Sequence, residues 1–143
     1  MKVVLDTNVL ISATLFSGSL AEKLFDKLLI HGAQIYCSTA ILSEYELIVR
    51  RDFAEHRKLV SVQENLHVFM ARIIQAVCLV EPRVKVTLER DPMDAHILEC
   101  ALASASDYIV TFDEDLLELK EYENIRIIHP LEMVTISEKI KKE

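Results

Sequence analysis

Four acidic residues interrupt stretches of sequence that are otherwise apolar, and their type and placement indicate a single metal site. They are Asp6, Glu44, Asp94 and Asp113. An ionised carboxylate that faces an apolar interior costs several kcal/mol unless a positive charge lies against it. Three of the four have no Lys or Arg beside them in the sequence, so a shared divalent cation would account for all of them.

The ligand chemistry of such a site narrows the choice of metal. Carboxylate oxygens without His or Cys suit Mg²⁺ or Mn²⁺ rather than zinc, and the five histidines show no zinc-binding spacing. Ser12, Ser43 and Cys37 have no recognisable base nearby, so a covalent nucleophile is not supported. Carboxylate-bound metals most often serve phosphoryl chemistry, because the cation polarises a phosphate and lowers the pKa of a bound water.

Short β-branched runs alternate with helical patterns, in the order βαβα(α)βαβα, which predicts one α/β domain over residues 1–143. Such alternation implies a parallel sheet covered on both faces, with a ligand site beyond the carboxyl ends of its strands. Asp6 and Asp113 each follow a predicted strand, so both should emerge at that edge. The predicted strands are 2–5, 34–37, 108–111 and 126–128, with 77–80 either a strand or a helix end, and the predicted helices are about 19–31, 39–51, 57–76, 92–106 and 116–121, with a last one after Pro130.

Asp6 and Glu44 each have a structural alternative. Asp6, or Thr7 beside it, has the right type to cap the helix that follows the first strand. Glu44 falls on the apolar stripe marked by Ile41 and Ile48, so it should point inward while Glu46 points away. A carboxylate turned inward without a local basic partner favours a functional role for Glu44.

The other two acids stand at predicted helix starts. Asp91 suits the N-cap position before Pro92, which leaves Asp94 as an acid in the first turn. Asp94 also heads an apolar stripe that runs through Ile97, Leu98, Ala101 and Ala105, which places it at the core-facing edge of its helix.

Asp113, Glu114 and Asp115 begin a short helix that one of them should cap. Asp113 is our site candidate because it lies nearest the strand end, and Asp115 is the second choice. Capping alone does not predict that four acids should gather at one edge of one sheet, so the joint pattern favours a site.

Composition excludes several classes of protein. The chain has 143 residues, 51% of them hydrophobic, and no apolar run near the roughly 20 residues that span a bilayer. Its two glycines allow neither a phosphate-binding loop nor a dinucleotide fingerprint, so no nucleotide cofactor is expected. The start resembles no signal peptide, and the three scattered cysteines are typical of buried thiols in a reducing compartment. We therefore expect a cytoplasmic protein that does not bind membranes.

The charge balance disfavours general adhesion to nucleic acid but allows a local basic track. The formal net charge is −7 and the sequence pI is about 5.2, which opposes purely charge-driven binding to RNA or DNA. Positive charge gathers in one segment that contains Arg50, Arg51, Arg57 and Lys58. These four are the candidate RNA-binding residues, with a solvated helix face as the alternative.

The sequence resembles the PIN-domain family along nearly its whole length. Each matching segment is short and common, but four of them in order at these spacings are fairly specific. The segments are Leu5-Asp6-Thr7-Asn8-Val9, Ser43-Glu44-Tyr45, Asp91-Pro92-Met93-Asp94-Ala95-His96 and Thr111-Phe112-Asp113-Glu114-Asp115.

The resemblance implies a three-layer α/β/α sandwich and an Mg²⁺- or Mn²⁺-dependent nuclease that acts on RNA. Asp6, Asp94 and Asp113 would hold the metal and Glu44 would bind it directly or through water. Asn8 and Thr111, with Asp115 in support, would orient the ligands. Chains of this length that resemble the family are often toxins of type II toxin-antitoxin pairs, similar to virulence-associated protein C. That likeness implies a homodimer and an antitoxin peptide inserted into the acidic site.

Two other functions remain open from the sequence. A haloacid-dehalogenase-type phosphatase also begins with a strand followed by Asp, but it needs a second acid two positions later, where this chain has Asn8. A catalytically silent PIN-like module would bind RNA or protein, although the presence of all four acids argues against it. One residue departs from the family pattern, because Phe112 stands where a small or polar residue is common. We expect Phe112 to pack under the sheet edge rather than to stack on a base.

Overall fold

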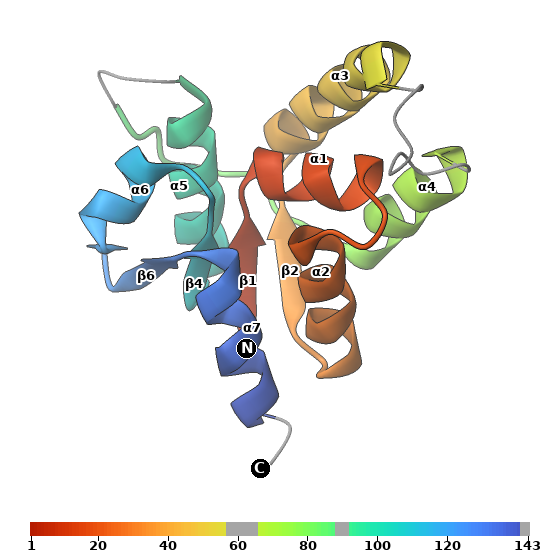
Figure 1. The fold of residues 1–143 in the computed structure, drawn as a ribbon. Helices are drawn as coiled ribbons and strands as arrows, with labels where there is room; N and C mark the ends of the chain where they lie inside the picture. Colours follow the sequence, from red (N-terminus) through yellow and green to blue (C-terminus); the bar gives the residue numbers. More distant parts are fainter. Residues whose placement is uncertain (57–65, 88–91, 141–143) are drawn as a thin grey trace.

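The computed structural model describes residues 1–56, 66–87 and 92–140, which form a twisted β-sheet flanked by helices (Figure 1). The part of the predicted helix that covers 57–65 lies outside the described residues, as do Arg57, Lys58 and Asp91. The elements in chain order are β1 (Lys2–Leu5), α1 (Thr7–Leu15), α2 (Leu20–Ile30), β2 (Gln34–Cys37), α3 (Thr39–His56), α4 (Leu66–Ala76), β3 (Cys78–Leu79), α5 (Pro92–Ser104), β4 (Tyr108–Val110), α6 (Glu114–Leu119), β5 (Glu121–Tyr122), β6 (Ile125–Ile128) and α7 (Pro130–Ile140).

The sheet is parallel except at one edge. Its strand order is β3-β2-β1-β4-β6-β5, and only β5 runs antiparallel to its neighbour β6. The chain leaves β1 toward β2 on one side and later returns to β4 on the other side, so the winding direction changes between β1 and β4. Ligand sites of open α/β sheets lie beyond the strand ends at such a switch point. The register aligns Leu5 with Val110, so the residues that follow both strands emerge together.

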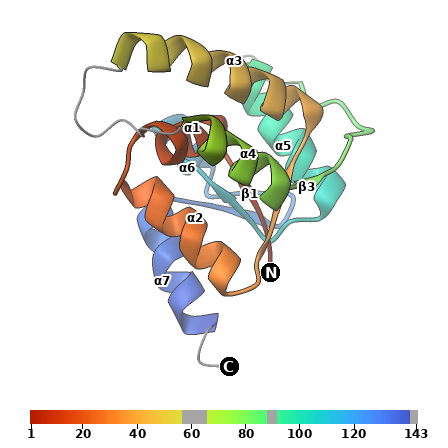
Figure 2. The same ribbon diagram turned by 90° about the vertical axis from the view of Figure 1, so that its right-hand side faces the viewer.

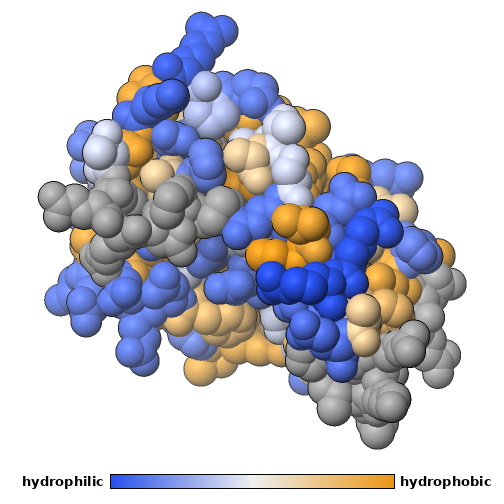
Figure 3. Space-filling model, turned by 90° about the horizontal axis from the view of Figure 1, so that it is seen from above, coloured by the Kyte–Doolittle hydropathy of each residue, from blue (hydrophilic) through white to orange (hydrophobic). Residues whose placement is uncertain are grey.

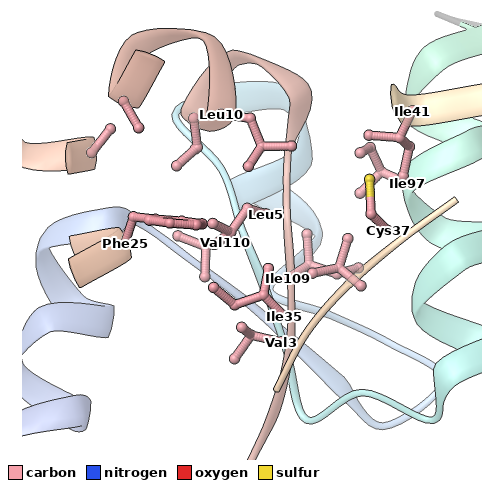
Figure 4. Packing of buried hydrophobic residues seen from close by; sticks show 14 of the residues in the cluster. Val3, Leu5, Leu10, Phe25, Ile35, Cys37, Ile41, Ile97, Ile109 and Val110 are labelled. Carbon is pink, nitrogen blue, oxygen red and sulfur yellow. The ribbon is translucent and has the colours of Figure 1, made fainter. Parts of the chain in front are cut away.

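Helices cover both faces of the sheet, which confirms the predicted α/β/α sandwich. Figure 2 shows α2 and α7 on one side of β1 and α5 on the other, and α2 packs directly against α7. The strand β1 is buried on both faces, as expected where helices cover a parallel sheet. In the core, Phe25 lies beside Leu5 and Val110 (Figure 4). Phe25 is fully buried, and burying a side chain of this kind contributes about 1.5–3 kcal/mol.

The ends of α2 follow from its sequence. The Ser19 hydroxyl accepts the backbone N–H of Glu22, which caps the first turn. At the other end Gly32 has a φ of +77°, a left-handed conformation that glycine adopts without steric cost. The N–H of Ala33 bonds to the carbonyl of Leu28 and that of Gly32 to Leu29, which is a Schellman motif. The helix stop predicted at Gly32 is confirmed.

Two features differ from the predicted order. The chain makes two helices between β1 and β2, because the apolar segment after Asp6 forms α1 before α2 begins. The short strand β5 was also missed. Glu123 and Asn124 both have positive φ, as a two-residue hairpin turn between antiparallel strands requires, so the chain turns back into β6 where the pattern predicted only a helix end.

A third difference concerns the end of α5, which stops at Ser104 rather than near Ser106. Ala105 has a φ of +51° and is exposed, so it does not belong to the buried stripe to which the sequence assigned it. The N–H of Ser106 bonds to the carbonyl of Ala101 and that of Ala105 to Leu102, which closes this helix in the same way as α2.

Two of the three cysteines agree with the expectation of buried free thiols, whereas Cys78 is only half-buried. All three cysteines are free thiols, and Cys37 and Cys100 are buried. Burial raises the pKa of each of these two thiols to about 12. Across the described residues, none of the helices combines the length and the apolar composition needed to cross a bilayer.

Candidate active site

Asp6 stands at the carboxyl end of β1, directly at the switch point of the sheet. Its backbone N–H bonds to the carbonyl of Val110, and its side chain is only 7% exposed. Although Asp6 occupies the N-cap position of α1, its side chain makes no cap hydrogen bond. Its Oδ2 atom instead accepts the hydroxyl of Thr111 at 2.6 Å. The capping alternative for Asp6 is therefore not what the structure shows.

Thr111 joins the acids of two neighbouring strands. It follows β4, is completely buried, and accepts the backbone N–H of Asp113 at its Oγ1 at 2.9 Å. A hydroxyl has one proton, and the Asp113 N–H already uses an acceptor site of Oγ1. The Thr111 proton is therefore directed at Asp6. This chain of two hydrogen bonds fixes Asp6 and Asp113 relative to each other.

Asp113 caps a helix and is also one of the candidate site residues. It is the N-cap of α6, where its Oδ1 accepts the N–H of Asp115 at 2.9 Å. The side chain is half-buried, and its second oxygen takes no part in the cap. Asp115, the second choice from the sequence, is exposed and contributes its backbone to this cap.

Asp94 reaches the same edge from a helix. It is the third residue of α5, which begins at Pro92 as predicted, and its side chain is 8% exposed. The residues one turn further on, Ile97 and Leu98, are completely buried. The helix α5 packs against β1, β2 and β4. Because α5 leads into the amino end of the parallel strand β4, its first turn lies at the carboxyl edge of the sheet.

Glu44 lies in α3, which starts directly after β2 at this edge. The fully buried stripe of α3 consists of Ile41, Tyr45 and Val49, and Glu44 flanks it. Its side chain is half-buried, with Oε2 closed off from solvent. Glu46 is exposed and bonds to Arg50 at 3.0 Å, so the predicted contrast between an inward and an outward Glu is confirmed.

Tyr45 fixes the helix that carries Glu44. Its hydroxyl shares a 2.6 Å hydrogen bond with Thr14 of α1. Burial raises the pKa of Tyr45 to about 12, although the Thr14 contact works in the opposite direction. The tyrosine therefore stays neutral and ties α3 to α1, the helix that begins at Asp6.

The donor chemistry of the edge fits a hard divalent cation. The candidate ligands are all carboxylate oxygens, which Mg²⁺ and Mn²⁺ prefer, and Asp6 and Asp94 are both more than nine-tenths buried. Among the described residues, however, no three His, Cys, Asp or Glu side chains are arranged as a ready-made metal cage. The strand pair is joined through Thr111, whereas Glu44 and Asp94 reach the edge from the helices α3 and α5.

The supporting residue Asn8 is exposed to solvent, and two of the basic candidates are paired with acids. Asn8 is exposed in the first turn of α1. Its neighbour Thr7 is buried, and its Oγ1 has no hydrogen-bond partner among the described residues. Of the basic candidates, Arg50 bonds to Glu46 and Arg51 to Asp52, which reduces the free positive charge on α3.

An aromatic pair was missed by the sequence analysis. Phe112 is 36% exposed, so it is not packed under the sheet edge as expected. Its ring meets that of His129 edge to face, with centroids 5.4 Å apart and planes at 80°. A usable signal was present, because His129 is a polar residue directly after a strand, as are Asp6 and Thr111. Seen from above, this edge of the molecule mixes hydrophilic surface with separate apolar patches (Figure 3).

Comparison with known proteins gives the family of the chain. The PIN domain model matches residues 2–115, which include all four acids. The chain therefore belongs to the PIN-domain family, whose members are generally nucleases and typically use divalent metal ions. Searches of curated proteins and of solved structures returned no match.

Proposed function

We propose that this member of the PIN-domain family is a metal-dependent ribonuclease that hydrolyses RNA phosphodiester bonds. The observation that carries the proposal is the hydrogen-bonded unit of Asp6, Thr111 and Asp113 at the switch point of the sheet. A buried carboxylate that was needed only to start α1 would cap that helix, and Asp6 does not. Its side chain is held for another purpose by a buried hydroxyl on the neighbouring strand.

The same residues suggest how a cation would be held. Asp6, Asp94 and Asp113 are the proposed ligands of Mg²⁺ or Mn²⁺, and Glu44 would bind directly or through water. When bound, the cation would polarise the scissile phosphate and lower the pKa of a water molecule. Thr111 orients the Asp6 carboxylate, because its hydroxyl donates to the Oδ2 atom of that side chain.

The reaction proposed for this site is a single in-line displacement. The activated water attacks phosphorus opposite the bridging 3′-oxygen, the bond between phosphorus and that oxygen breaks, and the oxygen leaves with a proton. The products are a 5′-phosphate and a 3′-hydroxyl. Asn8 at the mouth of the site can orient the incoming water or phosphate by hydrogen bonding.

The biological role that we propose is that of a toxin in a type II toxin-antitoxin pair. Support comes from the sequence resemblance to virulence-associated protein C. In this role the chain would act in the cytoplasm as a homodimer, and a cognate antitoxin would insert a peptide into the acidic site. Induced expression should then arrest growth, and the Asp94→Asn variant should not.

A second candidate is a catalytically silent PIN-like module that binds RNA or protein. The observation in its favour is that the described acids form no ready-made cage for a metal. The phosphatase alternative has no such support, since Asn8 replaces its second acid and the family match favours a nuclease.

Cleavage of a panel of single-stranded RNAs tests the proposal. Wild type, Asp94→Asn and Asp107→Asn are assayed with Mg²⁺ or Mn²⁺, and wild type is repeated with a chelator. Asp107 is a matched control because it precedes β4 at the opposite edge of the sheet, where it bonds to the N–H of Lys2. We expect cleavage by wild type and Asp107→Asn, and a loss of more than about 100-fold for Asp94→Asn, since even indirect partners of a metal are worth 10–100-fold.

Thermal unfolding of the same proteins separates loss of function from loss of fold. Asp94→Asn should unfold near the wild-type temperature and should no longer gain stability when Mn²⁺ is added. Wild type that leaves every RNA intact and is not stabilised by Mg²⁺ or Mn²⁺ would contradict the nuclease and favour the silent module.

A further inference from the structure

Phe112 is a large apolar side chain exposed inside the acidic site rather than beside it. It stands between Thr111, which is completely buried, and Asp113, which is half-buried. Scattered exposed apolar residues are normal on protein surfaces. This one lies within one residue of two members of the proposed site, at the same end of β4.

The ring of Phe112 is held in a fixed direction by the neighbouring strand. Val110 and Ile128 are register partners of β4 and β6, and the N–H of Thr111 bonds to the carbonyl of Ile128 at 3.1 Å. Phe112 and His129 therefore leave two adjacent strands at the same edge, and their rings meet in the edge-to-face geometry that aromatic pairs prefer.

His129 is itself anchored to the backbone. Its Nδ1 accepts the N–H of Leu131 at 3.0 Å in the first turn of α7. A backbone contact thus orients the His129 ring, and the Phe112 ring packs edge to face against it.

A cavity of about 710 Å³ continues from His129 along the sheet edge. Its volume lies within the range of about 300–1,000 Å³ that is usual for small-ligand sites. Leu117, Ile127 and Ile128 give it apolar walls, and the cations of Lys120 and Arg126 share it with the carboxylates of Glu121 and Glu132. Arg126 also lies over the ring of Tyr108, 5.7 Å from its centroid.

The two sides of the site differ in how freely they can meet a phosphate backbone. On α3, Arg50 and Arg51 are bonded to acidic neighbours. Near His129, Arg126 is shared with Glu132, and the exposed Lys120 makes no ion pair with any described residue. The second side thus offers an aromatic ring, apolar walls and a cation together, which suits an unstacked nucleotide.

We propose that Phe112, positioned by His129, is a stacking platform for a base of single-stranded RNA next to the scissile phosphate, and that the cavity beside Lys120 receives the following nucleotide. The inference rests on the ribonuclease function proposed above. Stacking on an aromatic ring is tolerant of base identity, because every base has a π-face. The subsite therefore selects single-stranded over duplex RNA rather than one sequence over another.

Binding is measured separately from cleavage to test this subsite. Single-stranded oligoribonucleotides carrying 2-aminopurine at successive positions are titrated against the Asp94→Asn protein. Stacking on Phe112 should quench the 2-aminopurine fluorescence at one position. Adding Phe112→Leu should remove that quench and weaken binding by about 5- to 150-fold, the range expected for one stacked base. Phe112→Tyr should restore both, and the same Phe→Leu change at Phe69 of α4 should alter neither.

The outcomes distinguish this inference from the function on which it rests. Tight binding with no loss in Phe112→Leu, while wild type cleaves RNA, would overturn the platform and leave the nuclease standing. Binding that depends on Phe112 in a wild type that does not cleave would support the platform and count against the nuclease. Wild type that neither binds nor cleaves any RNA contradicts both. In the active protein, Phe112→Leu should raise KM with little change in kcat, whereas a folding defect would lower the amount of active enzyme and hence kcat.

Discussion

The two pairs of acids at the sheet edge are held in different ways. Asp6 and Asp113 follow adjacent parallel strands and are connected through the buried hydroxyl of Thr111. Glu44 and Asp94 come from α3 and α5, and their positions depend on how those helices pack. A strand end fixes a side chain through the sheet register, whereas a helix can shift or rotate slightly on its apolar face.

This difference indicates that the two pairs of acids have different roles in the proposed site. The strand pair is organised before any ligand binds, as catalytic groups that must hold a metal precisely are expected to be. We propose that the helix pair is the adjustable half of the site, because its two acids are carried by packed helices rather than by the sheet register. We infer that a cation would first meet the strand pair and that the helix acids complete its surroundings.

Removing the hydroxyl of Thr111 should disconnect Asp6 from Asp113, the two acids that follow adjacent strands. Thr111→Val keeps the shape but leaves Asp6 without its donor and the Asp113 N–H without its acceptor. We expect cleavage to fall by about 10–100-fold, as for other partners that orient metal ligands. The free energy of unfolding should fall by about 1–3 kcal/mol, because Asp6 and the Asp113 N–H each lose their hydrogen bond to Thr111.

Thr111→Ser is the matched control for that prediction. It retains the hydroxyl and loses one methyl group, so its activity should stay near wild type. Metal titrations followed by thermal unfolding should show weaker Mn²⁺ binding for Val than for Ser. Equal activity of the two variants would mean that the hydrogen-bonded unit does not organise the site.

Glu44→Gln tests the adjustable half. Because Glu44 is half-buried and flanks the packed stripe of α3, we expect a loss of activity below about tenfold, the lower limit for indirect metal partners. Glu46→Gln on the same helix should change nothing beyond about 0.5 kcal/mol of stability, since it only removes an exposed ion pair with Arg50. A loss for Glu44→Gln as large as that for Thr111→Val would show that Glu44 is as fixed as the strand pair.

The sequence predicted the strand-borne half better than the rest of the molecule. A polar residue directly after an apolar strand has a defined direction, because parallel strands end at one edge, so Asp6 and Asp113 could be grouped without coordinates. Thr111 joined them only through the resemblance to the PIN-domain family. The proline at the start of α5 gave the placement of Asp94 in the same local way.

Features that depend on tertiary packing were harder to predict. The stripe of α3 was placed on Ile41 and Ile48, whereas the structure buries Ile41, Tyr45 and Val49, because the packing of α1 against Tyr45 decides the face. The contact between Phe112 and His129 joins residues of neighbouring strands that are not consecutive in the chain. Such a pairing follows from strand order, which periodicity does not contain.

The reactivity of the buried thiols reports how firmly α3 and α5 pack against the sheet. Among these tests we expect it to have the smallest effect on catalysis. Cys37 lies beside Ile41 of α3 and Ile97 of α5 (Figure 4), and Cys100 belongs to α5 itself. With a pKa near 12 instead of 9.0, each thiol has about 1,000-fold less thiolate at neutral pH. A thiol reagent should therefore modify the half-buried Cys78 first, and all three cysteines only in denaturant. Rapid modification of Cys37 in the native protein would mean that α3 and α5 part readily from the sheet.

The same thiols should make the folded protein less stable at alkaline pH, as proton linkage requires. The folded protein holds these protons more tightly than the unfolded chain, so their contribution is fully present below pH 9 and declines as the pH rises toward 12. In that pH range each thiol should lower the free energy of unfolding by about 1.4 kcal/mol per pH unit. Urea unfolding at pH 8 and pH 10 should show a smaller loss for Cys37→Ala than for wild type. An identical loss in both would place Cys37 in a more hydrated position, and α3 would then be less firmly packed over the strand pair than its buried stripe implies.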